Sequence, residues 1–340
     1  MEFPPLRGFT FVRCLGRGGM ATVWEARQHD PERTVAVKIL TDDISSRPKD
    51  VEAFYAEAKT AGALDHPNIV TVFEVGCQAG RYYYVMELAA GYDTGKWLAR
   101  KGRLKETDVL TVAESVGVAL EYAERELGII HCDIKPANIM VDGDGTVRLT
   151  DMGIARFISS NEASDCISGT PCYMSPEQAT GMAELDARAD IYSLGATIYH
   201  LLSGHPLFAG RSDEEILQCQ CSDAVPDVRT LNPEVSAPCA VLLARFLAKD
   251  RENRPSNWPE ALALIRAVLA YDDSSPRPDS PPEGLARFTK PSTMELDGPE
   301  GEDAEEEPAR PARKAFPIFW PLVALAALAV FAAAFLLARA

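Results

Sequence analysis

Four polar residues in the middle of the chain have the types and the spacing that a phosphoryl transfer requires. Asp133 stands two residues before Lys135 and five before Asn138, and Asp151 follows thirteen residues after the asparagine. The aspartate offers a carboxylate to receive a hydroxyl proton, the lysine an ammonium for the moving phosphate, and the asparagine an amide oxygen for magnesium. Together they predict a site for phosphoryl transfer.

The segment between these residues must fold back on itself if all four are to meet. Residues 146–150 alternate as a strand does, and residues 142–145 contain two Asp-Gly pairs, which favour a hairpin turn. We therefore expect a hairpin that brings Asp151 beside Asn138 and completes the metal site.

A glycine-rich turn lies near the start of the chain, between two predicted strands. Backbone amides can approach phosphates closely only where side chains are missing, and Gly16 and Gly18 provide such positions. Taken alone, the turn is equally compatible with an ordinary hairpin.

A lysine and a glutamate follow the turn at a spacing that suggests a pair. Lys38 ends a strand-like run, and Glu57 lies nineteen residues later on a predicted helix. A lysine that holds the first two phosphates of a nucleotide must itself be positioned by a carboxylate. Each residue alone would be a solvated surface charge, but in this order after the glycine turn they predict a nucleotide-holding ion pair.

The periodicity of the chain predicts a small lobe rich in strands followed by a larger helical lobe. The predicted strands cover residues 9–27 (two strands joined through the glycines), 34–40, 70–75 and 81–88, and the clearest helices cover residues 51–64, 105–127 and 189–203.

Three further motifs complete a recognisable order. They are Gly-Thr-Pro-Cys-Tyr-Met-Ser-Pro-Glu at 169–177, Asp-Ile-Tyr-Ser-Leu-Gly at 190–195 and Lys-Asp-Arg-Glu-Asn-Arg-Pro at 249–255. With them, residues 9–269 resemble a bacterial eukaryotic-like (Hanks-type) serine/threonine protein kinase. The resemblance implies an α+β, two-lobed protein kinase fold, with a β-rich N-lobe at residues 9–88 and an α-helical C-lobe at residues 92–269.

The resemblance also implies an activity and a set of site residues. The activity is transfer of the γ-phosphoryl group of ATP to serine or threonine of proteins, the kinase itself included. Asp133 would be the catalytic base, Lys135 a phosphate clamp, and Asn138 and Asp151 the ligands of Mg²⁺ or Mn²⁺. The implied ATP-binding residues are Leu15, Gly16, Gly18, Val23, Ala36, Lys38, Met86 as gatekeeper, Glu87 to Ala89 through their backbone, and Met140.

The resemblance also assigns two ion pairs and an anchoring carboxylate. Lys38 and Glu57 would form the ion pair of the active state. Glu177 and Arg254 match a buried structural ion pair, and Asp190 matches an anchor beneath the catalytic loop.

The chain departs from the family pattern at three positions. Ala21 replaces a third glycine, which a small side chain should tolerate. Cys132 stands where the family usually has an arginine that receives an activation-loop phosphate, so we expect activity to depend less on such phosphorylation, although Ser164 or Ser168 remain acceptors. Met152 replaces a phenylalanine, which should make the metal turn somewhat more mobile while it remains competent.

These departures leave a second class of function open. A nucleotide-binding pseudokinase that acts as a membrane-tethered signalling scaffold would also keep this fold. Such proteins generally lose one of the two essential aspartates, whereas Asp133 and Asp151 are both present here.

Composition limits the partners. The formal charge of −16 argues against a nucleic-acid binder, because phosphate contacts need a basic stripe. The eight cysteines show no paired metal-binding spacing and are expected to be reduced thiols. Residues 271–314, with many prolines and twelve acidic against six basic residues, predict a disordered juxtamembrane linker.

Residues 316–338 carry no charge and are long enough to span a bilayer as a helix. We expect a single-pass anchor in the cell (plasma or inner) membrane, with the kinase domain in the cytoplasm because Arg310, Arg313 and Lys314 precede the segment. A buried C-terminal helix is the alternative. The alanines within this segment also leave homodimerisation through the helix open.

Overall fold

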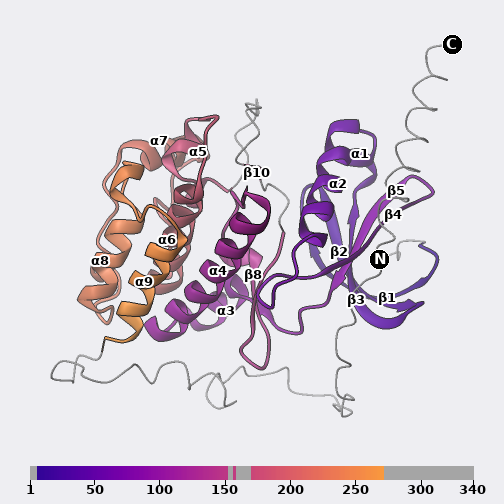
Figure 1. The fold of residues 1–340 in the computed structure, drawn as a ribbon, viewed down its shortest axis with the longest axis horizontal. Helices are drawn as coiled ribbons and strands as arrows, with labels where there is room; N and C mark the ends of the chain where they lie inside the picture. The colour runs from indigo at the N-terminus through magenta and orange to yellow at the C-terminus, as the bar shows by residue number, and fades with distance from the viewer. Residues whose placement is uncertain (1–5, 152–155, 158–169, 272–340) are drawn as a thin grey trace. The chain divides into compact units, whose positions relative to one another are not determined.

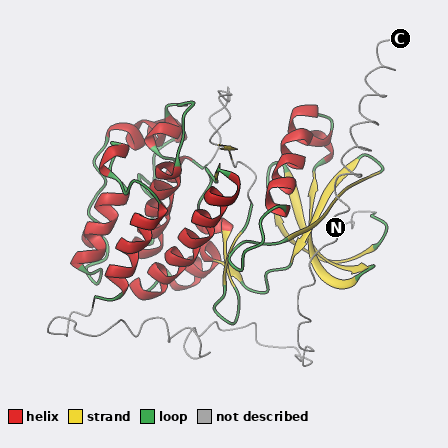
Figure 2. Ribbon diagram, in the orientation of Figure 1, coloured by secondary structure: helices red, strands yellow, loops and turns green. Residues whose placement is uncertain are grey.

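The computed structural model describes residues 6–151, 156–157 and 170–271 (Figure 1). The main sheet lies in the N-terminal part of these residues, and most helices lie in the C-terminal part (Figure 2). This division confirms the predicted α+β architecture of a β-rich N-lobe and a helical C-lobe.

The N-lobe is built on one antiparallel sheet of five strands. Its spatial order is β1-β2-β3-β5-β4, and a short helix and a longer helix are inserted between β3 and β4. The elements are β1 (Phe9–Arg17), β2 (Ala21–His29), β3 (Glu32–Leu40), α1 (Asp42–Ser45), α2 (Pro48–Gly62), β4 (Val72–Gln78) and β5 (Arg81–Glu87).

The two faces of this sheet bury separate apolar clusters, because side chains alternate along each strand. Tyr83 and Val85 of β5 lie in one cluster with Trp24. Tyr84 lies in the other, with Phe54 of α2, and Met86 packs against it. The side chains that face α2 are therefore those that can reach a residue carried by that helix.

The C-lobe contains short strands and the longer helices. In chain order it comprises β6 (Tyr92–Asp93), α3 (Thr94–Lys101), α4 (Glu106–Leu127), β7 (Ile129–Ile130), η1 (Pro136–Asn138), β8 (Ile139–Val141), β9 (Val147–Leu149), β10 (Arg156–Phe157), η2 (Pro171–Tyr173), α5 (Pro176–Ala179), α6 (Ala187–Ser203), α7 (Asp213–Ser222), η3 (Val228–Thr230), α8 (Ala237–Phe246), η4 (Arg251–Asn253) and α9 (Trp258–Leu269), where η marks a 3₁₀ helix.

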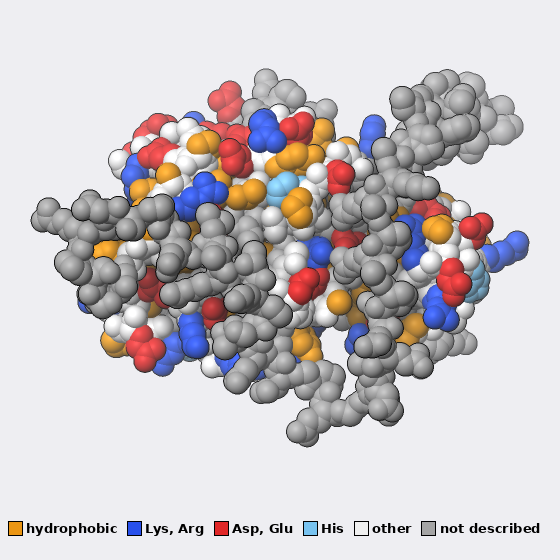
Figure 3. Space-filling model, turned by 60° about the horizontal axis from the view of Figure 1, so that its bottom comes forward, with side chains coloured by type: hydrophobic (Ala, Val, Ile, Leu, Met, Phe, Trp, Pro, Cys, Tyr) orange, Lys and Arg blue, Asp and Glu red, His pale blue; other side chains and the backbone are white. Residues whose placement is uncertain are grey.

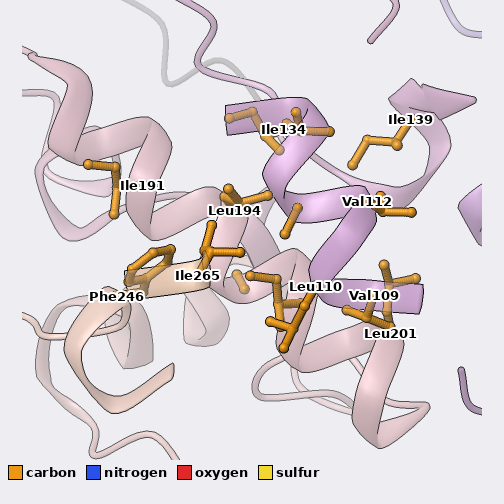
Figure 4. Close-up of a cluster of buried hydrophobic side chains, with 14 of the residues drawn as sticks. Val109, Leu110, Val112, Ile134, Ile139, Ile191, Leu194, Leu201, Phe246 and Ile265 are labelled. Carbon is orange, nitrogen blue, oxygen red and sulfur yellow. The ribbon is translucent and has the colours of Figure 1, made fainter. Parts of the chain in front are cut away.

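The C-lobe core forms around α4 and α6. Val109, Leu110 and Ala113 of α4 repeat at helical spacing and are almost fully buried. Figure 4 shows Leu110 of α4 and Ile191 and Leu194 of α6 among the members of one cluster of buried hydrophobic residues. The two central helices thus give the loops between them a rigid base.

The predicted hairpin is present between β8 and β9. The Gly145 amide donates to the Asp142 carbonyl at 2.9 Å, and Gly145 has φ +84°, which favours glycine. Beyond the hairpin, the Thr150 amide donates to the Asn138 carbonyl at 2.9 Å. Asp151 therefore follows directly beside Asn138, as the spacing predicts.

The lobes are joined by backbone pairing as well as by the chain. The Leu149 amide donates to the Asn68 carbonyl at 2.8 Å, and the Val70 amide donates to the Leu149 carbonyl at 3.0 Å. The Asn68 side-chain amide also donates to the Val147 carbonyl at 2.8 Å. The segment after α2 is therefore held against the hairpin that ends at Asp151.

Acidic and basic side chains are interspersed on the face of the described residues that Figure 3 presents. Several ion pairs among the described residues are partly exposed, as in Arg266 of α9 with Glu114 of α4, at 2.6 Å. Pairs of this kind contribute little stability each, because water screens them. The apolar cores and the buried ion pair described next must stabilise the fold.

Glu177 of α5 and Arg254 after η4 form the predicted buried ion pair. Two guanidinium nitrogens lie 2.6 and 2.9 Å from the two carboxylate oxygens, and the Arg254 side chain has no exposed surface. The guanidinium also donates to the carbonyls of Ala248, Arg188 and Lys249. Arg254 therefore connects the segment before α9 to α5.

Most of the predicted linker and all of the predicted anchor, residues 316–338, lie outside the described residues. Among the residues that the structure describes, no helix is long and apolar enough to cross a membrane.

Replacing Glu177 by glutamine should lower the free energy of unfolding by about 3–5 kcal/mol, because the buried Arg254 guanidinium would lose its counter-charge. Urea unfolding of the purified protein measures this change. Glu126→Gln, in an exposed pair with Arg125 on α4, is the matched control and should change stability by about 0–1 kcal/mol. Equal effects of the two variants would contradict a stabilising role for the buried pair.

Candidate active site

Lys38 lies at the centre of the site, between two carboxylates from different parts of the chain. Its Nζ is 2.8 Å from Oε1 of Glu57 on α2 and 2.7 Å from Oδ1 of Asp151 after β9. The predicted pair of Lys38 and Glu57 is therefore present, and Asp151 joins it from the C-lobe.

The charges of this cluster support one another. Burial lowers the pKa of the Lys38 ammonium, but the carboxylates of Asp151 and Glu57 outweigh that effect and raise it overall. Only 15% of the lysine side chain and 9% of the Glu57 side chain are exposed, against 38% for Asp151. Lys38 is thus a permanently charged ammonium at the back of the site, and Asp151 faces its open side.

Tyr84 is a further member of the cluster that the sequence analysis missed. It pairs with Lys38 across β3 and β5, and its hydroxyl donates to Oε1 of Glu57 at 2.7 Å. Burial raises the pKa of Tyr84 well above its usual range, and the Glu57 carboxylate adds to that effect, so the hydroxyl keeps its proton. The alternation of side chains along β5 predicts that Tyr84 and Met86 share one face of the sheet. A tyrosine at this position does not by itself predict a hydrogen bond to Glu57.

The glycine-rich turn is a tight hairpin end. Gly16 pairs with Val23 across β1 and β2, and the Gly18 amide donates to the Ala21 carbonyl at 2.9 Å. A Cβ added at Gly16 would meet nothing within 4 Å, and one at Gly18 would make only an ordinary contact with Ala21. Packing within the fold therefore does not require glycine at either position.

The residues implied for the adenine lie around the start of the inter-lobe connection. Ala36 is buried and pairs with Met86 across β3 and β5. Leu15, Val23 and Met140 are half-buried, the last in β8 of the C-lobe. These positions give apolar side chains from both lobes that remain partly accessible.

The backbone after Met86 already makes one hydrogen bond within the protein. The Glu87 amide donates to the Thr71 carbonyl at 2.8 Å, so recognition of a base by this segment would use the Glu87 carbonyl and the backbone of Ala89. The Glu87 side chain lies 3.6 Å from the buried Arg148 guanidinium, which also pairs with Asp142. The connection is therefore fixed to the β8–β9 hairpin.

The catalytic-loop residues contact one another around Asp133. Lys135 Nζ lies 2.7 Å from Oδ2 of Asp133 and 2.9 Å from Oγ1 of Thr170. The Thr170 hydroxyl lies 3.3 Å from the other carboxylate oxygen of Asp133. A hydroxyl can thus reach this carboxylate while the ammonium stands beside both.

Asn138 and Asp151 offer oxygen atoms suited to a hard cation. The Asn138 side-chain nitrogen donates to the Asp133 carbonyl at 2.9 Å and to its carboxylate at 3.1 Å, which turns the amide oxygen away from Asp133. Lys38 contacts one oxygen of Asp151 and leaves the second. Mg²⁺ prefers few carboxylate or amide oxygens with phosphates and water completing its shell, so this donor set fits the ion.

Asp190 of α6 anchors the loop from below, as predicted. Its two carboxylate oxygens accept the amides of His131 at 2.7 Å and Cys132 at 2.8 Å. Burial raises the pKa of Asp190, while His131 and the two amides oppose that effect. Cys132 adopts φ +66°, a left-handed conformation that these bonds stabilise in a residue with a side chain.

The Cys132 thiol points into the protein. It is buried in a small apolar cluster with Ile130, Leu185 and Ala189, and the Cys132 carbonyl accepts the Gln178 side-chain amide at 2.8 Å. The catalytic loop is therefore held by Asp190 and Gln178 at the position where the family usually has a phosphate-binding arginine. Met152, Ser159, Ser160, Ser164 and Ser168 lie outside the described residues.

The segment after Thr170 lies beside this loop and is tied to α6. The Tyr173 hydroxyl is 2.7 Å from Nδ1 of His200, and burial lowers the pKa of His200 to about 4, with a smaller effect of His205. A neutral imidazole with its proton on Nε2 accepts this hydrogen bond from the tyrosine. The segment is thereby held by a bond that persists at neutral pH.

The chain belongs to the protein kinase family: the family model described as "Protein kinase domain" matches residues 9–266. Its domain is of the bacterial Hanks type, a protein-serine/threonine kinase domain. It is 33% identical over 266 residues to "Serine/threonine-protein kinase PrkC" of Bacillus subtilis, covering 78% of this chain and 41% of that protein.

Two other relatives give the same picture. Identity is 35% over 274 residues to "DNA damage-responsive serine/threonine-protein kinase RqkA" of Deinococcus radiodurans, covering 78% of this chain and 40% of that protein. It is 34% over 289 residues to "Serine/threonine-protein kinase PknA" of Mycobacterium tuberculosis, covering 82% and 65%. The chain thus spans about two fifths of the length of the first of these relatives.

Tyr84→Phe should lower kcat/KM for ATP about three- to tenfold, because Glu57 would lose one of the two bonds that hold it against Lys38. Steady-state kinetics with varied ATP measures this effect. Tyr82→Phe is the matched control, since Tyr82 lies on the same strand and its ring packs on Tyr55. If both variants behaved like the unsubstituted protein, Tyr84 would have no part in positioning Glu57.

Proposed function

We propose that this protein transfers the γ-phosphoryl group of ATP to serine and threonine hydroxyls of other proteins and of itself. The convergence of both lobes on one cluster carries the proposal. Lys38 from β3 contacts Glu57 of α2 and Asp151 of the C-lobe, within the arrangement that also holds Asp133 and Asn138. Phosphoryl transfer is mostly positioning and charge neutralisation, which is what this arrangement provides.

Each residue has a step that its contacts support. Lys38, held by Glu57, would bind the inner phosphates of the nucleotide. Asp133 would accept the proton of the attacking hydroxyl, and Lys135, 2.7 Å from that carboxylate, would neutralise charge on the transferred group. Thr170, in contact with both, would hold the acceptor side of the site.

The metal would be held by Asn138 and Asp151 through the oxygens that their other contacts leave. Bound Mg²⁺ or Mn²⁺ supplies neutralisation of phosphate charge there. Asn138 is also oriented by Asp133, so the same hydrogen bonds align the base and one metal ligand.

The nucleotide would lie between the lobes. Its base would contact Leu15, Val23, Ala36 and Met140, with Met86 behind it, and its phosphates would lie beneath Gly16 and Gly18. The absence of any packing demand for glycine at these two positions supports this placement. The domain would extend over residues 9–269.

Asp133→Asn should lower phosphate transfer by about 10²- to 10⁴-fold, because the amide cannot accept the hydroxyl proton. Labelled ATP with magnesium, a generic basic protein as acceptor and identification of phosphoserine and phosphothreonine measure this. Omitting the acceptor tests transfer to the protein itself, and removing the metal with a chelator should stop both reactions.

Asp144→Asn makes the same chemical change in the β8–β9 turn, where asparagine can still accept the Thr146 amide, and should leave transfer unchanged. Nucleotide binding without any transfer by the unsubstituted protein would instead support the scaffold alternative. Activity that survives in Asp133→Asn would reject the assigned base.

We further propose that residues 316–338 anchor the kinase in the cell membrane as a single span, with the catalytic domain in the cytoplasm. The support is the uncharged length of the segment and the basic residues before it. A flexible linker over residues 271–314 would have a root-mean-square reach of about 36 Å. Substrates would then be proteins close to the membrane, and close contact of alanines between two spans would allow a homodimer.

Deleting residues 316–338 should move the protein from the membrane fraction to the soluble fraction, because the acidic, proline-rich sequence of residues 271–314 has no apolar run long enough to span a bilayer. Fractionation of cells followed by an alkaline carbonate wash measures the distribution. Replacing the segment by an artificial Leu-Ala span of equal length should restore membrane recovery. Soluble recovery of the full-length protein would contradict the anchor.

A further inference from the structure

A chain of hydrogen bonds runs through the C-lobe from the half-buried Lys249 to the segment after Thr170. Lys249 Nζ donates to the Tyr192 hydroxyl at 3.0 Å. The Tyr192 hydroxyl donates to Oε1 of Gln220 at 2.6 Å, and Nε2 of Gln220 donates to the Pro171 carbonyl at 3.0 Å. The chain therefore links α6 and α7 to η2 across 78 residues of sequence from Pro171 to Lys249.

The two central members of this chain are fully buried, and Lys249 and Pro171 at its ends are half-buried. Tyr192 and Gln220 have no exposed surface. Lys249 lies over the rings of Tyr192, at 5.5 Å, and Phe208, at 4.9 Å, and donates a further hydrogen bond to the Cys219 carbonyl at 3.2 Å. Buried polar groups lose free energy when a partner is missing, so these bonds are strongly coupled to their positions.

The lysine gives the chain a direction. Burial lowers the pKa of Lys249 to about 8, so at neutral pH its side chain is mainly an ammonium. An ammonium can only donate, so the Tyr192 oxygen accepts from it and directs its own proton elsewhere. That proton goes to the carbonyl oxygen of the Gln220 amide, which fixes the amide orientation. The nitrogen of the same amide then faces the Pro171 carbonyl as a donor, rather than presenting a second acceptor to it.

The end of the chain lies next to the acceptor side of the site. Pro171 has no amide proton, so its carbonyl is the one hydrogen-bonding group of its backbone, and it also accepts the Met174 amide at 3.3 Å. Its neighbour Thr170 contacts both Asp133 and Lys135. The segment that begins at Thr170 therefore lies beside the carboxylate that would accept the proton of a substrate hydroxyl.

We propose that Lys249, Tyr192 and Gln220 are positioning residues that set residues 170–174 for the protein substrate. This inference rests on the proposed kinase function and deepens it. The three residues act through the Pro171 carbonyl, and they contact none of the residues assigned to the nucleotide or the metal. Their loss should therefore raise KM for the acceptor and leave KM for ATP unchanged.

Two variants of the full-length protein test the chain at successive bonds. Tyr192→Phe keeps the ring that contacts Lys249 and removes only the hydroxyl, and Gln220→Met keeps the length of the side chain and removes both of its bonds. Each should raise KM for a serine-containing acceptor peptide about three- to tenfold with KM for ATP unaltered. Tyr199→Phe removes a buried hydroxyl from the same helix outside this chain and should not change either constant.

The double variant distinguishes positioning from general loosening of the core. Because the two side chains act on one carbonyl in series, Tyr192→Phe with Gln220→Met should be no worse than the stronger single variant. Thermal melts measured in parallel report any stability loss. Additive effects, or lower melting temperatures with both KM values unchanged, would overturn the inference, whereas no transfer by the unsubstituted protein would instead overturn the proposed function.

Discussion

The ammonium of Lys38 between the carboxylates of Glu57 and Asp151 is the interaction on which the rest of the site depends. A cation with so little exposure is tolerated only while opposite charges surround it. One carboxylate belongs to the N-lobe and the other to the C-lobe, so Lys38 contacts both only when the lobes meet in this arrangement. Each group is positioned by a different element. Pairing of β3 with β5 positions Lys38, packing of α2 positions Glu57, and the β8–β9 hairpin positions Asp151.

Much of this arrangement could be predicted because it depends on local spacing. The alternation around Lys38, the helical pattern around Glu57 and the Asp-Gly turn before Asp151 each determine a short element, and the order of the motifs then brings the elements together. The roles of Asp190 and of the pair of Glu177 with Arg254 were predicted from the family resemblance and not from local spacing. The element ends differed by a few residues, as in α2, which begins at Pro48 rather than at residue 51.

Other features depend on contacts between distant residues whose types carry no signal. The residue type of Tyr84 predicts only a core aromatic. Its hydroxyl becomes a hydrogen-bond partner of Glu57 because α2 packs opposite it. The chain from Lys249 to Gln220 forms only when the tertiary fold brings Tyr192 of α6 to Gln220 of α7. The left-handed backbone of Cys132 and the burial of its side chain are likewise not indicated by any residue pattern nearby.

The bond from Tyr84 to Glu57 has a consequence for selective inhibition. Met86 stands between the region implied for adenine and the cluster around Glu57, and Tyr84 fills the space behind it on the same strand face. A compound that extends past Met86 toward α2 must displace a buried ring and break a hydrogen bond to a carboxylate. Compounds confined to the space in front of Met86 avoid that penalty. A compound that extends past Met86 should therefore bind this kinase more weakly than a kinase with a smaller residue at the position of Tyr84.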